Sequence, residues 1–226
     1  MAIIHDTTMS PGKLELLATW LPAQPWYLGR GCEPELTKAG GFRLDDPRGE
    51  VGIEFMVVTD GSGDETVTYQ VPMTYRARAL AGADAGLIGT AEHGVLGHRW
   101  IYDGTRDLVL VAQLVAAIQG EAEPQAQGVS HTPDPTVNSQ PVTGEALTAI
   151  GSAVAASGPS GTDLRVETAR ADGEPGGELS VRINRILRPA NGAVLDGDVE
   201  VPGLSATWRG PGGTRVRGVF ATARYG

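Results

Sequence analysis

The sequence predicts an α+β fold, with antiparallel sheets that are each packed by one or two helices and arranged as two consecutive halves. Two segments, residues 51–59 and 67–75, alternate apolar and polar side chains, as half-buried antiparallel strands do. Residues 108–118 place apolar side chains at helical spacing. Residues 121–143 are rich in Pro, Gln, Ser and Thr, which is typical of a connection between two folded parts.

The first half begins with a predicted short strand at residues 3–8. Ser10 and Pro11 then form an N-cap and a proline at the first helical position. The helix that follows ends at Pro22. The next segment, as far as Pro47, has many Gly and Pro residues and is predicted to be an ordered loop.

The strands 51–59 and 67–75 are joined by a predicted hairpin at residues 60–64. Pro72 cannot donate to a strand ladder, so the second of these strands is expected to lie at an edge or to contain a bulge. A third strand is predicted around residues 99–102. The second helix is expected to be capped by Asp103 or Thr105, to bury a stripe of apolar residues between 108 and 118, and to end at Gly120.

The predicted domain boundaries are residues 1–132, a linker at 133–143, and residues 144–226. The second half is expected to begin with a weak helix at residues 145–156. Strand-like runs complete it, with a hairpin between the last two at residues 209–213; they lie at residues 164–169, 179–187, 199–208 and 214–222.

Charge and composition restrict the partners and the compartment. The 226 residues carry a net charge of -9, which argues against nucleic acid and anionic membranes as partners. No apolar run reaches the roughly 18 residues that a membrane-spanning helix needs, and the first residues lack a secretory signal. The single Cys32 allows no internal disulfide. We therefore expect a cytoplasmic protein.

Metal and nucleophile sites are weakly indicated. His93, His98 and Asp103 do not have the spacing that brings ligands together on a strand or a helix, and zinc sites usually need three or four clustered ligands. Cys32 lies beside Glu33, whose negative charge opposes thiolate formation. We therefore predict no catalytic residue, no metal and no cofactor.

Aromatic and acidic residues in the first half are the candidate ligand-binding residues. Trp26, Tyr27 and Phe42 could offer flat faces to a sugar ring, and Asp45 and Asp46 could bind its hydroxyl groups. The alternative is that the aromatic residues pack the core and that the two carboxylates belong to a solvated turn. Two further carboxylates, Glu50 and Glu54, lie close by in the sequence.

The first 140 or so residues resemble the N-terminal cap of actinobacterial maltokinases, and most closely the short stand-alone proteins that share this cap. Relatives of that kind are sometimes labelled alpha-glucan branching proteins, although this chain is too short for the barrel that a branching enzyme needs. The resemblance extends over several collinear segments, which are residues 11–17, 21–27, 40–47, 49–56, 68–76 and 92–104.

The resemblance implies a cap without its kinase body. A maltokinase body phosphorylates maltose with ATP and Mg²⁺, and it needs a phosphate-binding lysine, a catalytic-loop aspartate and a metal-binding aspartate. Residues 180–188 resemble the lysine strand only faintly, with Arg182 at the lysine position. No His-Gly-Asp or His-x-Asp sequence follows.

Three functions remain open on the sequence. The first is an interaction or regulatory module that binds a protein partner of trehalose, maltose or glucan metabolism, or that self-associates. The second is a module that binds maltose or a glucan through the aromatic loop. The third is an unrecognised sugar-active enzyme that uses Asp45, Asp46, Glu54 or His98.

Overall fold

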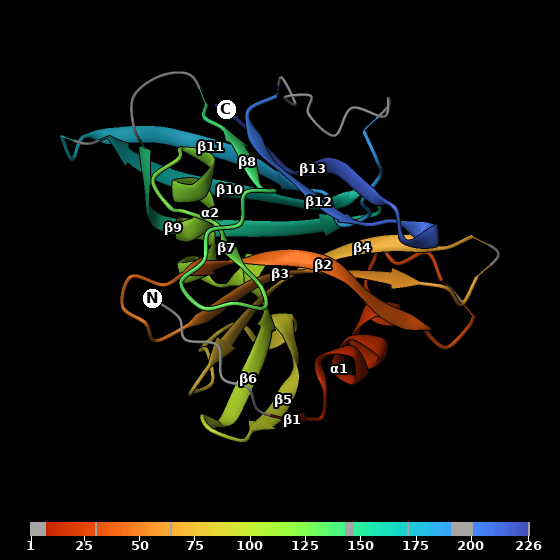
Figure 1. Cartoon of the computed structure of the whole chain (residues 1–226). Coiled ribbons are helices and arrows are strands. Elements are labelled where there is room, and N and C mark those ends of the chain that lie inside the picture. The colour runs from red at the N-terminus through yellow and green to blue at the C-terminus, as the bar shows by residue number, and fades with distance from the viewer. Residues whose placement is uncertain are drawn as a thin grey trace.

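The computed structural model describes residues 8–29, 31–63, 65–142, 147–170, 172–190 and 201–225. These residues form a single antiparallel sheet with two short α-helices, so the predicted α+β class with two sheets is wrong (Figure 1). The strand order is β1-β5-β6-β4-β3-β2-β12-β13-β11-β10-β9, with β7 beside β2 and β8 beside β12.

The first part of the chain supplies one end of this sheet and the helix α1. Figure 1 shows α1 and the β5–β6 hairpin on the same side of β2, β3 and β4. The elements are β1 (Met9–Ser10), α1 (Lys13–Trp20), β2 (Leu36–Asp45), β3 (Gly52–Asp60), β4 (Val67–Arg76), β5 (Leu87–His93) and β6 (Gly97–Asp103), with short 3-10 turns η1 (Leu21–Ala23), η2 (Asp84–Gly86) and η3 (Gly104–Arg106).

The second part supplies α2 and the remaining strands. The elements are α2 (Leu108–Ile118), β7 (Gln125–Ala126), β8 (Asn138–Gln140), β9 (Leu147–Gly158), β10 (Gly161–Arg170), β11 (Pro175–Ile183), β12 (Gly203–Arg209), the 3-10 turn η4 (Pro211–Gly213) and β13 (Arg215–Tyr225). Strands from both predicted halves thus share one sheet. The division at residues 133–143 stays a prediction.

Strands with clear alternation were predicted well. The predicted strands 51–59 and 67–75 correspond to β3 and β4, and the predicted second helix contains α2, which begins only at Leu108 because the separate turn η3 precedes it. The cap of α2 is Asp107, whose side chain accepts from the Val109 N–H, and not Asp103 or Thr105. Asp103 instead caps η3 by accepting from the Thr105 N–H.

Three local predictions differ from the structure. The predicted helix at residues 145–156 falls on the strand β9, which pairs along β10. The predicted loop up to Pro47 contains the strand β2. Gly12, rather than Ser10, is the N-cap of α1. The predicted strand 3–8 falls almost wholly outside the described residues.

The two faces of β3 pack against two different cores. Ile53, Phe55 and Val57 point into a large core that α2 and the strands of the second part complete. Met56 and Val58 point the other way, into a smaller core with α1 and β4. Because β3 is buried on both faces, it packs against the core that contains α1 and against the core that contains α2.

The residues that follow β11 form backbone hydrogen bonds with β4, which lies in the other part of the sheet. The N–H of Gln70 donates to the carbonyl of Arg185 at 2.9 Å, and the N–H of Leu187 donates to the carbonyl of Thr68 at 2.9 Å. Pro72 follows on the same edge of β4, before the pairing with β6 begins at Met73. This edge explains how an inner strand tolerates a proline, because the absent N–H falls between two partners.

A buried arginine connects the two parts of the chain at this junction. The side chain of Arg185 is fully buried, its Nη2 donates to Asp103 Oδ1 at 2.7 Å, and its Nε donates to Thr162 Oγ1 at 2.8 Å. Its guanidinium carbon lies 5.1 Å from the ring centroid of Trp26. The arginine therefore contacts the end of β6, the strand β10 and the smaller core at the same time.

We predict that Arg185→Ala lowers the free energy of unfolding by about 3–5 kcal/mol, because it leaves the buried carboxylate of Asp103 without its charged partner. Urea denaturation followed by circular dichroism measures this change. The matched control is Arg182→Ala, which removes an exposed pair with Asp163 and should cost less than about 1 kcal/mol. Equal losses for the two variants would contradict the assigned role of Arg185.

Candidate functional site

A cleft of about 530 Å³ lies where α2 begins. One wall is the turn between β2 and β3, and the other is the first two turns of α2 with Val166 of β10. Leu108 lines it with a side chain that is 53% exposed. The lining residues are mostly apolar, with charged groups from Asp46, Arg48, Glu50 and Arg76.

Asp46 holds the turn that forms one wall of the cleft. Its buried carboxylate accepts from the backbone N–H groups of Arg48, Glu50 and Val51 at 3.0, 2.9 and 3.0 Å. These three hydrogen bonds hold the turn in one conformation, so Asp46 shapes this wall of the cleft.

Arg76, which also lines the cleft, forms an ion pair that anchors α2. Arg76 Nε donates to Asp107 Oδ2 at 2.6 Å, and Arg76 Nη2 donates to Asp107 Oδ1 at 2.7 Å. The hydrogen bonds to Asp107 raise the pKa of Arg76 above its ordinary value, although partial burial opposes this increase. Since Asp107 is fully buried and also caps α2, the pair ties the end of β4 to the start of the helix.

A second cluster surrounds Glu54, on the opposite face of β3 from the large core. Its Oε2 accepts from Lys13 Nζ at 2.6 Å and from the Tyr75 hydroxyl at 2.5 Å, and its Oε1 accepts from Gln127 Nε2 at 3.0 Å. Burial raises the pKa of Glu54, but the charge and hydrogen bond of Lys13 and the Tyr75 hydroxyl outweigh it and lower the pKa. Burial, with Glu54 nearby, raises the pKa of Tyr75.

Two of the predicted ligand-binding residues lie inside the smaller core. Trp26 is 0% exposed and Tyr27 is 1% exposed, and both rings pack against Tyr69. The hydroxyl of Tyr27 donates to Asp60 Oδ2 at 2.7 Å. Burial and this contact raise the pKa of Tyr27. Neither ring presents a face to solvent, so sugar binding at them stays a prediction that would require this loop to open.

The other predicted residues are placed apart from these rings. Phe42 is fully buried in the large core, where its ring stacks on Phe55 with centroids 4.6 Å apart. Asp45 ends β2 and is partly exposed, next to the buried Asp46. The structure therefore separates the predicted aromatic group between two cores and assigns Asp46 to the cleft.

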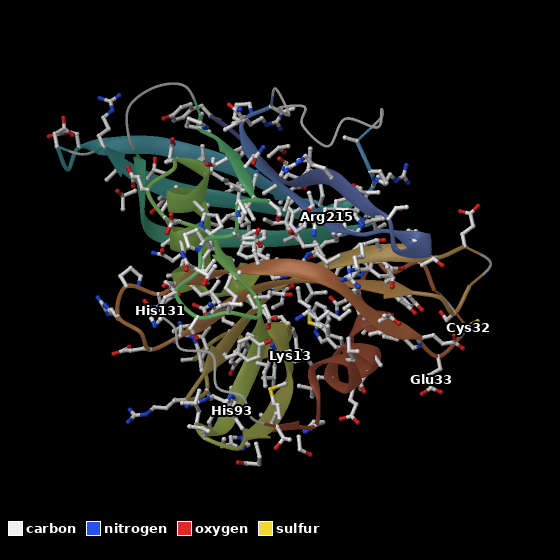
Figure 2. The ribbon with its side chains drawn as sticks, in the orientation of Figure 1. Lys13, Cys32, Glu33, His93, His131 and Arg215 are labelled. Carbon is white, nitrogen blue, oxygen red and sulfur yellow. The ribbon has the colours of Figure 1, made fainter. Side chains whose placement is uncertain are left out.

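The predicted metal and nucleophile candidates are dispersed. Figure 2 shows Cys32 and His93 at different places on the molecule, and Cys32 is exposed. His98 pairs with Glu92 at 2.6 Å, whereas Asp103 binds Arg185. Among the described residues, no group of three or more His, Cys, Asp or Glu side chains could hold a metal ion.

Five buried carboxylates occur in the described part of the chain, and donors hold each of them. The five are Asp46, Glu54, Asp60, Asp103 and Asp107. The contacts of Asp46, Glu54 and Asp107 are given above. Asp60 accepts from Tyr27 and two backbone N–H groups, and Asp103 accepts from Arg185 and Thr105. The cleft thus combines apolar walls with charged groups that already have partners. Such a site can bind a partner, but it offers no unpaired buried acid for catalysis.

Residues 20–107 match the family model of the maltokinase N-terminal cap domain. This segment, the cap-like region, is therefore similar to the maltokinase N-terminal cap domain. It runs from the end of α1 through η3, so the cleft lies at its border, between its charged turn and α2. No curated protein matches the chain. Among the described residues, no helix is long and apolar enough to cross a membrane.

The sequence reasoning missed the residues that organise this region. Arg76, Arg185 and Lys13 bind carboxylates that are far away in the sequence, so no local pattern reveals them. Asp107 could have been found, because an aspartate immediately before the first residue of a helical apolar pattern is a strong N-cap signal.

We predict that the pairing of Glu54 makes stability depend on pH in the acid range. Its folded pKa lies below the ordinary value of 4.5, so the unfolded chain takes up a proton first as the pH falls. The stabilisation is present above the unfolded pKa and is lost as the pH drops through the folded pKa. Urea midpoints measured from neutral pH downward should therefore fall below about pH 4.5.

The urea midpoint of the variant Glu54→Gln should fall less steeply over that pH range, because the variant has no carboxylate to protonate at this position. Glu178→Gln is the matched control, since it removes an exposed carboxylate elsewhere. If Glu54→Gln and the unmodified chain lost stability in parallel, the assigned pKa direction would be wrong.

Proposed function

We propose that the chain is a non-catalytic interaction module whose cap-like region links it to maltose, trehalose or α-glucan metabolism. The observation that carries the proposal is the state of the buried carboxylates, since all five that are described already have structural partners. The match of residues 20–107 to the maltokinase cap supports the metabolic link.

The exposed apolar residues of the cap-like region and its border support binding over catalysis. Val95 and Leu96, at the tip of the β5–β6 hairpin, are 59% and 46% exposed. Leu108 is exposed at the rim of the cleft. Together with the mostly apolar lining of the cleft, Leu108 forms part of a contiguous apolar surface, and surfaces of this kind are typical of protein–protein contacts.

The partner class that fits is an enzyme of this metabolism, and a maltokinase is the first to test. Sedimentation velocity with the purified chain and a purified maltokinase should show a complex. Leu108→Asp should weaken that complex at least tenfold, about 1.4 kcal/mol, because a charge enters the apolar wall. Val154→Asp is the control, because Val154 is 62% exposed and does not line the cleft.

The competing enzymatic function is tested in the same preparation. Incubation with ATP–Mg²⁺ and maltose, and separately with an α-glucan, should give no turnover above the buffer rate. Turnover that Glu54→Gln abolishes, while the variant remains folded, would replace the proposal with an enzyme. Absence of a complex with maltokinase and with the other enzymes of maltose, trehalose and glucan metabolism would also overturn it.

A further inference from the structure

The end of the chain is basic, although the protein as a whole is acidic. The net charge is -9, yet the sequence from residue 201 onward contains four basic residues and no acidic one. All four are arginines that lie on or at the ends of β12 and β13: Arg209, Arg215, Arg217 and Arg224. The positive charge of this last segment is therefore gathered on one hairpin.

The pairing of β12 with β13 brings three of these arginines to one face of the sheet. Arg209 lies directly opposite Arg215, and Arg217 lies opposite Thr207. Because side chains alternate along a strand, these residues share a face. Trp208, between them in the alternation, is 3% exposed and belongs to the large core. The arginines therefore occupy the outer face.

The facing pair Arg209 and Arg215 places two like charges directly opposite each other. Arg209 and Arg215 are both exposed, and no carboxylate among the described residues pairs with either one. Arg217 Nη1 lies 3.4 Å from Ser205 Oγ. Like charges directly opposite each other destabilise a strand pair. An anion placed between the guanidinium groups would remove that repulsion and gain hydrogen bonds.

We propose that the outer face of the β12–β13 hairpin, beside its turn, binds an acidic segment of a partner protein. This inference rests on the proposed function and names the chemistry of the partner. Guanidinium groups pair with carboxylates through two parallel hydrogen bonds, and this favours Arg over Lys at such a surface. Figure 2 labels Arg215 on this C-terminal part of the sheet.

The shape and charge of the surface favour an extended peptide over the other anions. None of the three arginines lines the cleft, and an open sheet face does not enclose a small ligand as a pocket does. A nucleic acid would place dense negative charge against a protein of net charge -9, and that repulsion opposes binding. An acidic segment presents a few carboxylates that match a few guanidinium groups.

The test is fluorescence anisotropy of a labelled peptide that alternates Glu with Gly and Ser. We expect saturable binding to the full chain at about 50 mM NaCl and at least tenfold weaker binding at about 300 mM NaCl, because salt screens exposed charges. Arg215→Glu should weaken binding at least tenfold. Arg78→Glu, which changes the net charge equally at an exposed loop position, should change it less than twofold.

A conservative variant separates the geometry from the charge. Arg215→Lys keeps the positive charge but loses the paired hydrogen bonds, so its affinity should fall between those of the unmodified chain and Arg215→Glu. Circular dichroism of each variant confirms that it is folded. If Arg215→Glu loses its fold, Arg215→Lys and Arg209→Gln carry the test.

Three results would overturn the inference. They are the absence of saturable peptide binding, an equal loss for Arg78→Glu and Arg215→Glu, and tighter binding of a single-stranded oligonucleotide of the same charge. The peptide assay contains no maltokinase, so its outcome is independent of the test of the proposed function. A maltokinase complex that persists without peptide binding would refute the acidic segment alone.

Discussion

The burial of one arginine is the constraint on which the arrangement of the molecule depends. Arg185 follows β11, contacts Trp26 of the smaller core, and binds both Asp103 and Thr162. A buried guanidinium must be paired where it lies, so these segments have one permitted relative position. The backbone bonds between β4 and the residues after β11 lie at the same junction. Charge and hydrogen bonding thereby join the cap-like region to the rest of the chain.

Two other ion pairs also join elements that are distant in the sequence. Arg76 with Asp107 attaches the helix α2 to β4, and Lys13 with Glu54 attaches the helix α1 to β3. Few aromatic residues are available to the cores, since they make up only 5% of the chain. Ion pairs with a buried carboxylate therefore supply specific contacts between elements. These carboxylates are committed to structure, and this is the physical reason for proposing binding rather than catalysis.

Local sequence patterns predicted the parts of the fold that depend on burial of one face. β3, β4 and α2 have regular periods, and both strands were predicted nearly to their ends, whereas only the end of α2 was placed closely. β9 consists of small and uncharged residues with no clear period, so only its pairing with β10 identifies it as a strand. The ion pairs that hold the elements together were harder to predict, because the Asp103–Arg185 pair, for example, joins residues 82 positions apart. An aromatic residue in a loop also gives no local sign of its burial, as Trp26 demonstrates.

The central claim is that the cap-like region and the remainder of the chain form one cooperative body around Arg185. Native-state hydrogen exchange tests this most directly, because it reports the opening free energy of each segment. The amides of β3 and β4 should open with the same free energy as those of β10 and β11, close to that of global unfolding. Exchange of β10 and β11 at a clearly lower free energy, while β3 and β4 stay protected, would show two independent units and contradict the claim.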